Sequence, residues 1–88
     1  MIQQTLNALC DPTRREIIKM LKSSPRSAGE IAQRFDVSLP AISRHLKVLQ
    51  DAEIVRSRRE GKFIYYELSL DMIRDLALWL GDFLRECE

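Results

Sequence analysis

The sequence predicts a mainly α-helical domain with one β-hairpin, from the spacing of its apolar residues. Apolar residues recur with helical spacing in four stretches before residue 54 and in one stretch after residue 69. Between these, residues 54–68 carry the β-branched and aromatic pattern that is typical of strands. The chain has 88 residues, 45% apolar and 31% charged, which suits a single domain over residues 1–88.

The first two predicted helices lie on either side of an Asp-Pro pair. Ile2, Leu6 and Leu9 follow the i, i+4, i+7 spacing of a short amphipathic helix. Asp11 can accept hydrogen bonds from the free N–H groups that begin the next helix. Pro12 fits the first helical position because its missing N–H would be unpaired there. This second helix is expected to end at the Ser-Ser-Pro sequence that follows.

A capping box predicts where the third helix begins. The Ser27 side chain can accept from the N–H of Glu30, whose carboxylate can accept in turn from the N–H of Ser27. This helix is short, because Asp36 and Val37 follow and Ser38 can begin another cap.

The fourth predicted helix covers about residues 38–53 and has two different faces. Its apolar residues fall on one stripe: Ile42, Leu46 and Leu49. At about 100° per residue, the opposite face is small near its start and basic in its middle. The residues on that outward face are Pro40, Ser43, Arg44, Lys47 and Asp51.

A hairpin and a last helix complete the chain. Residues 54–58 and 63–68 are predicted as strands joined by a turn over residues 59–62, in which Gly61 can take a positive φ. The last helix is expected over about residues 69–85, with Ser69 as its cap. It has an unusually wide apolar surface, formed by Met72, Ile73, Leu76, Trp79, Leu80, Phe83 and Leu84.

A helix at the end of a small domain cannot bury all of its sides against its own chain. We therefore expect its apolar surface to form part of the core and part of a homodimer interface, together with the first helix. The residues expected in this interface are Ile2, Leu6, Leu76, Trp79, Leu80 and Phe83.

The charges divide unevenly along the chain. Residues 1–68 hold 12 Lys or Arg and 8 Asp or Glu, a net charge of +4, whereas residues 69–88 hold 2 and 5, a net charge of −3. Within the first part, residues 44–62 hold six basic and three acidic side chains. A charge run is usually a solvated face, so these cations bear on function only if the fold gathers them on one side.

The order of these elements predicts a winged helix-turn-helix that binds double-stranded DNA. The second of two helices that meet across a short turn can enter the major groove, which is about 12 Å wide. The recognition helix, residues 38–53, has small residues for close approach and then hydrogen-bond donors. The wing, residues 56–66, can reach adjacent phosphates or the minor groove. The side chains expected at the DNA are Pro40, Ser43, Arg44, Lys47, Arg58, Arg59 and Lys62.

Three segments of the chain resemble the ArsR/SmtB family of bacterial winged-helix repressors. They are ALCDPTRREIIKML at residues 8–21, SAGEIAQRFDVSLPAISRHLKVLQDAEIV at residues 27–55 and RREGKFIYYEL at residues 58–68. The middle segment has the family's Ser-x-His-Leu spacing, and the DPTRR run is similar to the small SdpR-like autorepressor branch. The resemblance implies a homodimeric transcriptional repressor on a palindromic operator. It also implies that residues on or beside the recognition helix are Ser38, Pro40, Ser43, Arg44 and His45, with Arg58, Arg59 and Lys62 in the wing. Leu39, at the start of that helix, is expected at the DNA as well.

The chain departs from the metal-sensing patterns of that family. The segment GEIAQRF, residues 29–35, has no cysteine, and the last helix has no histidine. Zinc takes about four N, S or O ligands, so no metal and no cofactor are expected. Cys10 is expected to be a small buried residue and Cys87 a terminal one. A metal- or thiol-responsive sensor is the alternative, if the first and last helices bring these two cysteines together.

Two basic side chains near the recognition helix each have two interpretations. His45 is expected to pack within the fold and donate a hydrogen bond there, with a DNA phosphate contact as the alternative. Arg14 and its neighbour Arg15 are expected to pair with nearby acids, whereas Arg14 could instead reach a phosphate. On the second strand of the hairpin, one of Tyr65 and Tyr66 is expected to pack inward.

Several function classes are disfavoured by the sequence. There is no nucleophile–base pair, phosphate-cradling glycine loop or carboxylate pair of an enzyme. No apolar run approaches the roughly 18–20 residues of a membrane span, and the N-terminus lacks a secretory signal, so a cytoplasmic protein without membrane insertion is expected. A winged-helix protein-interaction module remains the alternative to DNA binding. A regulatory protein partner is one route by which repression would end.

Overall fold

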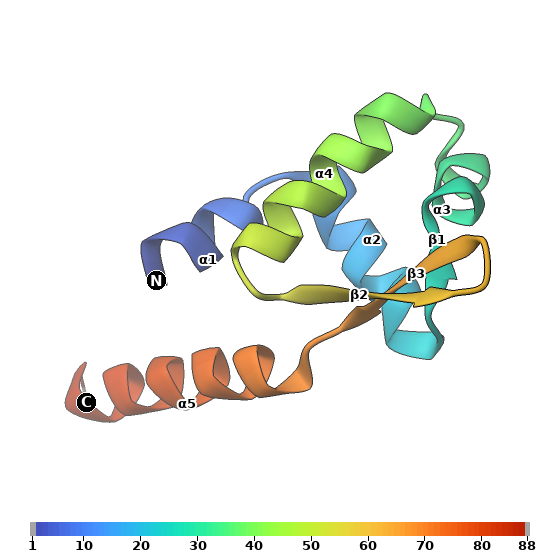
Figure 1. Ribbon diagram of the computed structural model, residues 1–88. Helices are drawn as coiled ribbons and strands as arrows, with labels where there is room; N and C mark the ends of the chain where they lie inside the picture. Colours follow the sequence, from blue (N-terminus) through green and yellow to red (C-terminus); the bar gives the residue numbers. More distant parts are fainter. Residues whose placement is uncertain (1, 88) are drawn as a thin grey trace.

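The predicted order of helices and hairpin is confirmed (Figure 1). The structure is a computed structural model that describes residues 2–87, with the side chains at positions 2, 83, 86 and 87 outside the description. The elements in chain order are α1 (Ile2–Ala8), α2 (Pro12–Ser23), β1 (Arg26–Ser27), α3 (Ala28–Phe35), α4 (Leu39–Asp51), β2 (Val55–Glu60), β3 (Phe63–Leu68) and α5 (Leu70–Cys87).

The predicted caps at Asp11, Ser27 and Ser38 begin their helices as expected. The Asp11 carboxylate accepts hydrogen bonds from the N–H groups of Thr13 (2.8 Å) and Arg14 (3.1 Å) at the start of α2. The capping box of α3 is complete, with both hydrogen bonds between Ser27 and Glu30 formed. At the start of α4, the Ser38 hydroxyl accepts from the N–H of residue 41 at 3.3 Å. Local hydrogen bonds therefore set where three of the helices begin.

The sheet differs from the prediction in two respects. It has three antiparallel strands in the order β1-β3-β2, and β1 was not predicted. Arg26 of β1 lies opposite Tyr66 of β3, so this short polar pair is a strand only because β3 supplies its hydrogen-bond partners. The turn of the hairpin is also shorter than expected, because Arg59 and Glu60 belong to β2. Gly61 takes the expected positive φ of 62° in this tight turn.

One apolar core holds the helices and the base of the hairpin together. Its buried residues are Ala8, Ile17, Leu21, Ile31, Ile42, Leu46, Leu49, Ala52, Ile54 and Val55. The predicted stripe of α4 is therefore confirmed as its inward face. Of the two tyrosines on β3, Tyr66 packs against this core, as expected for alternating side chains.

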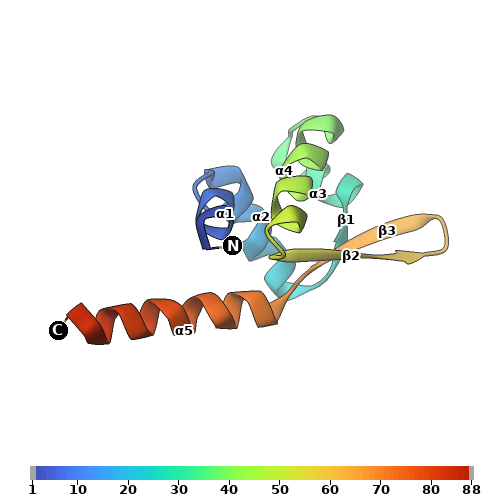
Figure 2. The ribbon, with the colours of Figure 1, turned by 60° about the vertical axis from the view of Figure 1, so that its left-hand side comes forward.

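The last helix, α5, extends away from this core as an arm, opposite the tip of the hairpin in both views (Figures 1 and 2). Met72 and Ile73 near its start pack against the core. The arm gives the molecule its elongated shape, with principal extents of 49 × 24 × 21 Å. None of the described helices is both long and apolar enough to cross a membrane.

The Asp11 cap makes the stability of the fold sensitive to acid. The hydrogen bond from the Arg14 N–H, aided by that of Thr13, lowers the pKa of the Asp11 carboxyl from its ordinary value. A carboxyl group with a lowered pKa in the folded state contributes its stabilisation fully above its unfolded pKa, about 3.9. That contribution is lost as the pH falls through the folded pKa.

We expect Asp11→Asn to keep a cap at neutral pH and to remove this part of the acid sensitivity, because asparagine caps without titrating. Urea unfolding of the wild type and the variant between neutral pH and pH of about 3 checks this. An equal loss of unfolding free energy with acid in both proteins would contradict the assignment.

Candidate nucleic-acid interface

The outward face of α4 is exposed along the predicted stripe. Ser43, Arg44 and Lys47 are all exposed, and so are Pro40 and Asp51 on the same face. At its start, Leu39 has half of its surface exposed (50%). The opposite stripe is buried in the core, which fixes the direction in which these polar side chains point. The helix therefore presents small residues first and cations second, as the sequence predicted.

The two cations of this face differ in their partners. Lys47 forms an ion pair with Asp51, one turn further on, at 3.4 Å, and both side chains are largely exposed. An exposed pair of this kind is weak. Arg44 has no ion pair among the described residues. Its guanidinium group has five N–H donors in a planar fork, which suits a base edge or a phosphate.

The wing cations are not equivalent either, which the sequence alone did not reveal. Arg58 lies 3.3 Å from Glu67 and 3.6 Å from Glu60, so carboxylates already balance its charge. Arg56 also contacts Glu67, at 3.5 Å, because the antiparallel register places the two residues opposite each other. Glu67 was the residue that sequence reasoning missed, and the strand register was the signal that would have found it.

Arg59 and Lys62, at the tip of the wing, form no ion pair within the described part of the chain. Arg59 Nε donates to the Gly61 carbonyl oxygen at 3.4 Å. Lys62 Nζ lies 5.6 Å from the centre of the Phe63 ring, a cation–π distance. Among the described cations of α4 and the wing, these two and Arg44 are therefore the ones without a carboxylate partner.

His45 of α4 and Arg14 of α2 form a contact between these two helices. Arg14 Nη1 lies 3.4 Å from His45 Nδ1, and because arginine has no acceptor, the histidine accepts this hydrogen bond. The sequence predicted that His45 donates within the fold, whereas at this contact its Nδ1 accepts. Arg14 also donates to the carbonyl oxygens of Ala8 (2.7 Å) and Asn7 (3.1 Å) at the end of α1.

Arg15 also forms a hydrogen bond near the end of α1. Its Nη1 donates to the Leu9 carbonyl oxygen at 2.7 Å. The expectation that Arg14 and Arg15 pair with acids is therefore wrong, because their partners are carbonyl oxygens of residues 7–9, at the end of α1 and just after it. This arrangement ties α1 to α2, and through His45 to α4.

The hairpin is attached to the end of α4. Gln50 Nε2 in the last turn of α4 donates to the Ser57 hydroxyl of β2 at 3.1 Å. Figure 2 shows the wing leaving the body of the molecule from this junction, while α5 runs in the opposite direction. The wing and α4 are thus neighbouring elements, and α5 is remote from the tip of the wing.

The described residues of the predicted dimer interface form an apolar surface on α1 and α5 that is largely exposed. Trp79 (43%), Leu80 (42%) and Leu6 (37%) are exposed, whereas Leu76 is half-buried. Leu76 lines an apolar recess of about 140 Å³ between α1 and the start of α5. The side chains of Ile2 and Phe83, which were assigned to the same interface, lie outside the described residues.

One of the two cysteines does not follow the prediction. Cys10 is exposed, with its Sγ donating to the Leu6 carbonyl oxygen at 3.2 Å, so the expectation that it is buried is wrong. It follows α1 in a turn, where the core does not cover it. The side chain of Cys87 lies outside the part that the structure describes. Among the described residues, no three His, Cys, Asp or Glu side chains gather to form a metal site.

The fold and this surface define a winged helix-turn-helix domain. Solved structures of the same kind superpose closely on it. An ArsR-like transcriptional regulator from Rhodococcus sp. RHA1 has a TM-score of 0.92 and 33% identity, over 97% of this chain and 78% of the other. The homodimeric winged helix-turn-helix DNA-binding domain of Mb0332 from Mycobacterium bovis, solved by NMR, has a TM-score of 0.78 and 27% identity, over 99% of this chain and 83% of the other.

The chain belongs to the family described as bacterial regulatory protein, arsR family, whose pattern matches residues 11–57. It is 39% identical to the transcriptional repressor SdpR of Bacillus subtilis, over 97% of this chain and 94% of that protein. It is 46% identical to the HTH-type transcriptional regulator Rv2034 of Mycobacterium tuberculosis, over 69% of this chain and 57% of that protein. The family resemblance predicted from the sequence is therefore confirmed, as is its similarity to SdpR.

Proposed function

We propose that this chain is a transcriptional repressor that binds an operator as a homodimer, with α4 in the major groove. The observation that carries the proposal is the exposed face of α4, on which Ser43 and Arg44 stand opposite a fully buried stripe. A helix held in this way can insert one polar face into a groove without disturbing the core. The family and the repressor SdpR, which matches nearly the whole chain, support the same function.

In this proposal the residues of α4 and of the wing have different roles. Arg44 and Ser43 read base edges, because a side chain in the major groove meets a distinct set of donors and acceptors for each base pair. Arg59 and Lys62 contact phosphates beside the groove, where they supply affinity without sequence information. Ser38 contributes by capping α4, and Leu39 and Pro40 contribute by allowing α4 to approach the DNA closely. His45 acts by binding Arg14 rather than by touching DNA.

The homodimer forms through α1 and α5. Leu80 and Trp79 present apolar surface on the arm, and burial contributes roughly 1.5–3 kcal/mol for each such side chain. The homodimeric Mb0332 domain, which covers 99% of this chain, supports a dimer of the same kind. Two-fold symmetry places the two α4 helices about one turn of DNA apart, so the operator is an inverted repeat.

A mobility-shift titration tests DNA binding itself against the protein-interaction alternative. The probe is the DNA upstream of the chain's own gene, with a shuffled duplex of equal length and composition as control. We expect a complex that forms on the upstream DNA at concentrations at which the shuffled duplex stays free. Equal affinity for both duplexes, or no complex with either, contradicts the proposal.

Replacing Arg59 with alanine is expected to weaken binding to all DNA sequences alike. Each lost phosphate contact reduces the slope of log K against log salt by about 0.9, so a dimer loses roughly 1.8. Fluorescence anisotropy titrations at several salt concentrations measure both quantities. Arg74→Ala removes the same charge from α5, where Arg74 pairs with Asp71, and is expected to leave the slope unchanged. A change in relative affinity between operator and non-operator DNA for Arg59→Ala would instead assign Arg59 to a base.

A further inference from the structure

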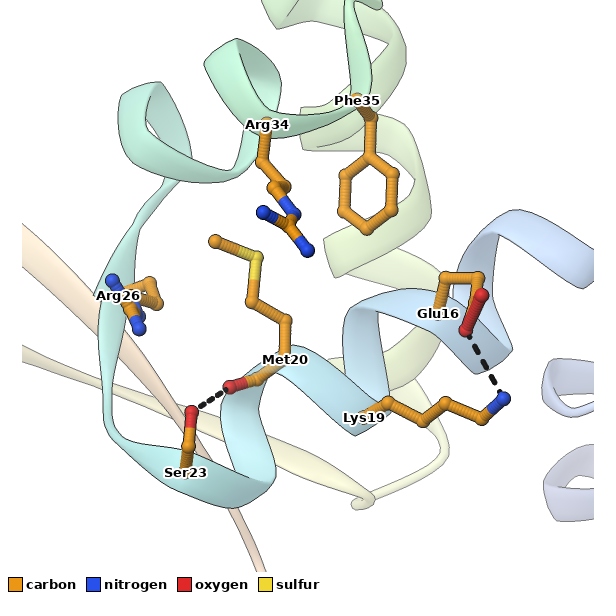
Figure 3. A pocket seen from close by; sticks show the side chains of 7 residues that line it. All are labelled: Glu16, Lys19, Met20, Ser23, Arg26, Arg34 and Phe35. Atoms are coloured by element: carbon orange, nitrogen blue, oxygen red, sulfur yellow. Dashed lines mark hydrogen bonds and ion pairs between the residues drawn. The ribbon is translucent and has the colours of Figure 1, made fainter.

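A second basic site, which contains no residue of α4 or of the wing tip, is a pocket of about 540 Å³ between α2, β1 and α3 (Figure 3). Arg26 of β1 and Arg34 of α3 line it, and Figure 3 shows the Met20 side chain between their guanidinium groups. Phe35 closes one side with its ring. The same two arginines and Met20 also line an adjoining groove, so the three side chains form one continuous surface.

The guanidinium group of Arg26 is incompletely satisfied. Its Nε is buried and has no hydrogen-bond partner among the described residues. A buried N–H donor without an acceptor is unfavourable, so the fold itself leaves this side chain incompletely satisfied. Within the described residues neither Arg26 nor Arg34 has an ion pair, so two positive charges face the pocket without a carboxylate partner.

The carboxylates near the pocket have other partners. Glu16 pairs with Lys19 at 3.3 Å at the edge of the pocket, as the dashed line in Figure 3 shows. Glu30, in the adjoining groove, accepts from the Ser27 N–H at 3.0 Å as part of the capping box. Neither carboxylate occupies the position beside Arg26 Nε.

The apolar walls restrict the class of ligand. Met20 and Phe35 both pack against the core and present their outer surfaces to the pocket. A thioether side chain adapts to ligands of different shape, and an aromatic ring offers a flat apolar surface. We propose that this pocket binds a small organic anion, with its phosphate or carboxylate on Arg26 and Arg34 and its apolar part against Met20 and Phe35.

The pocket adjoins the proposed DNA interface but shares no residue with it. β1 pairs with β3 of the hairpin, and α3 precedes α4 in the helix-turn-helix. None of its lining residues belongs to α4 or to the hairpin. Binding of a small anion can therefore be measured without DNA. A negative result in that measurement would leave the proposed repressor function untouched.

The test is an NMR titration of the isotope-labelled protein with phenyl phosphate, benzoate, inorganic phosphate and phenol. We expect phenyl phosphate or benzoate to shift the amide signals of residues 19–35 in a saturable way, and to bind more tightly than inorganic phosphate or neutral phenol. The preferred one of the two identifies the anionic group. Shifts confined to the wing, or no saturation by either organic anion in the millimolar range, would overturn the proposal.

Single variants assign the binding to the two arginines. Arg26→Gln and Arg34→Gln are each expected to weaken the preferred anion at least about tenfold, as for a lost charge-assisted hydrogen bond. Arg59→Gln, at the wing tip, is expected to leave it unchanged. Arg34 is exposed, so its variant keeps the proposal testable if Arg26→Gln unfolds. Unchanged anion binding in Arg34→Gln contradicts the proposal. So does a loss of operator affinity in that variant without any small anion, since it would assign these cations to the DNA backbone.

Discussion

Replacing both Ser43 and Arg44 with alanine is expected to weaken specific operator binding strongly while the protein stays folded. Both side chains are exposed on α4, so their removal leaves the core intact. A bidentate contact to a base contributes about 1–3 kcal/mol of discrimination, and a dimer makes the contact twice. The expected loss is therefore roughly 2–6 kcal/mol, or at least about thirtyfold in Kd. Anisotropy titrations with the operator, at fixed salt, measure it.

The control for this experiment removes a positive charge elsewhere. Arg74→Ala on α5 is expected to bind the operator as the wild type does, because Arg74 lies on the arm, beside Asp71. Non-specific DNA should lose less affinity than the operator in the double variant, since phosphate contacts from the wing remain. If the double variant keeps the affinity of the wild type for the operator, α4 is not the reading element.

Leu80→Glu is expected to convert the dimer into monomers and with this to remove operator binding. Leu80 is 42% exposed on the apolar side of α5, and it is not among the residues that pack on the core. Each dimer loses two buried leucines, at about 1.5–3 kcal/mol each, and gains two carboxylates without partners. The dimer dissociation constant should rise at least about a hundredfold. Sedimentation equilibrium over a range of concentrations measures it.

Leu78→Glu is the matched control on the same helix. Leu78 is 63% exposed but lies on the side of α5 that carries Asp71, Arg74 and Asp82, about 200° around the helix from Leu76. It should remain a dimer and bind the operator. A dimer that survives Leu80→Glu, or one that both variants disrupt equally, would remove α5 from the interface.

The parts of the fold that local hydrogen bonds determine were predicted well. The caps at Asp11, Ser27 and Ser38 were readable because the side chain and the N–H groups that it serves are at most three residues apart. The buried stripe of α4 was readable because helical periodicity is local as well. Strand β1 was missed because two polar residues carry no pattern, and only pairing with β3, some 40 residues later, makes them a strand.

The residues exposed on α4 were predicted from the sequence, but the ion pairs of the wing cations were not. Which residues face outward from α4 followed from the helical period. Glu67 could be assigned to Arg56 and Arg58 only after the strand register was known. Within the described residues, this leaves Arg59 and Lys62 as the wing cations without an ion pair. The contact between Arg14 and His45 joins residues 31 positions apart, so it depended on how α2 and α4 pack.

Selection of binding sites from random duplexes shows whether two copies of α4 read DNA together. The wild-type protein is incubated with the duplex library, and the retained DNA is sequenced after several rounds. We expect an inverted repeat with half-site centres about 10–10.5 base pairs apart, or a multiple of this. Enrichment of a single unrepeated half-site, or no enrichment over the starting library, would contradict it.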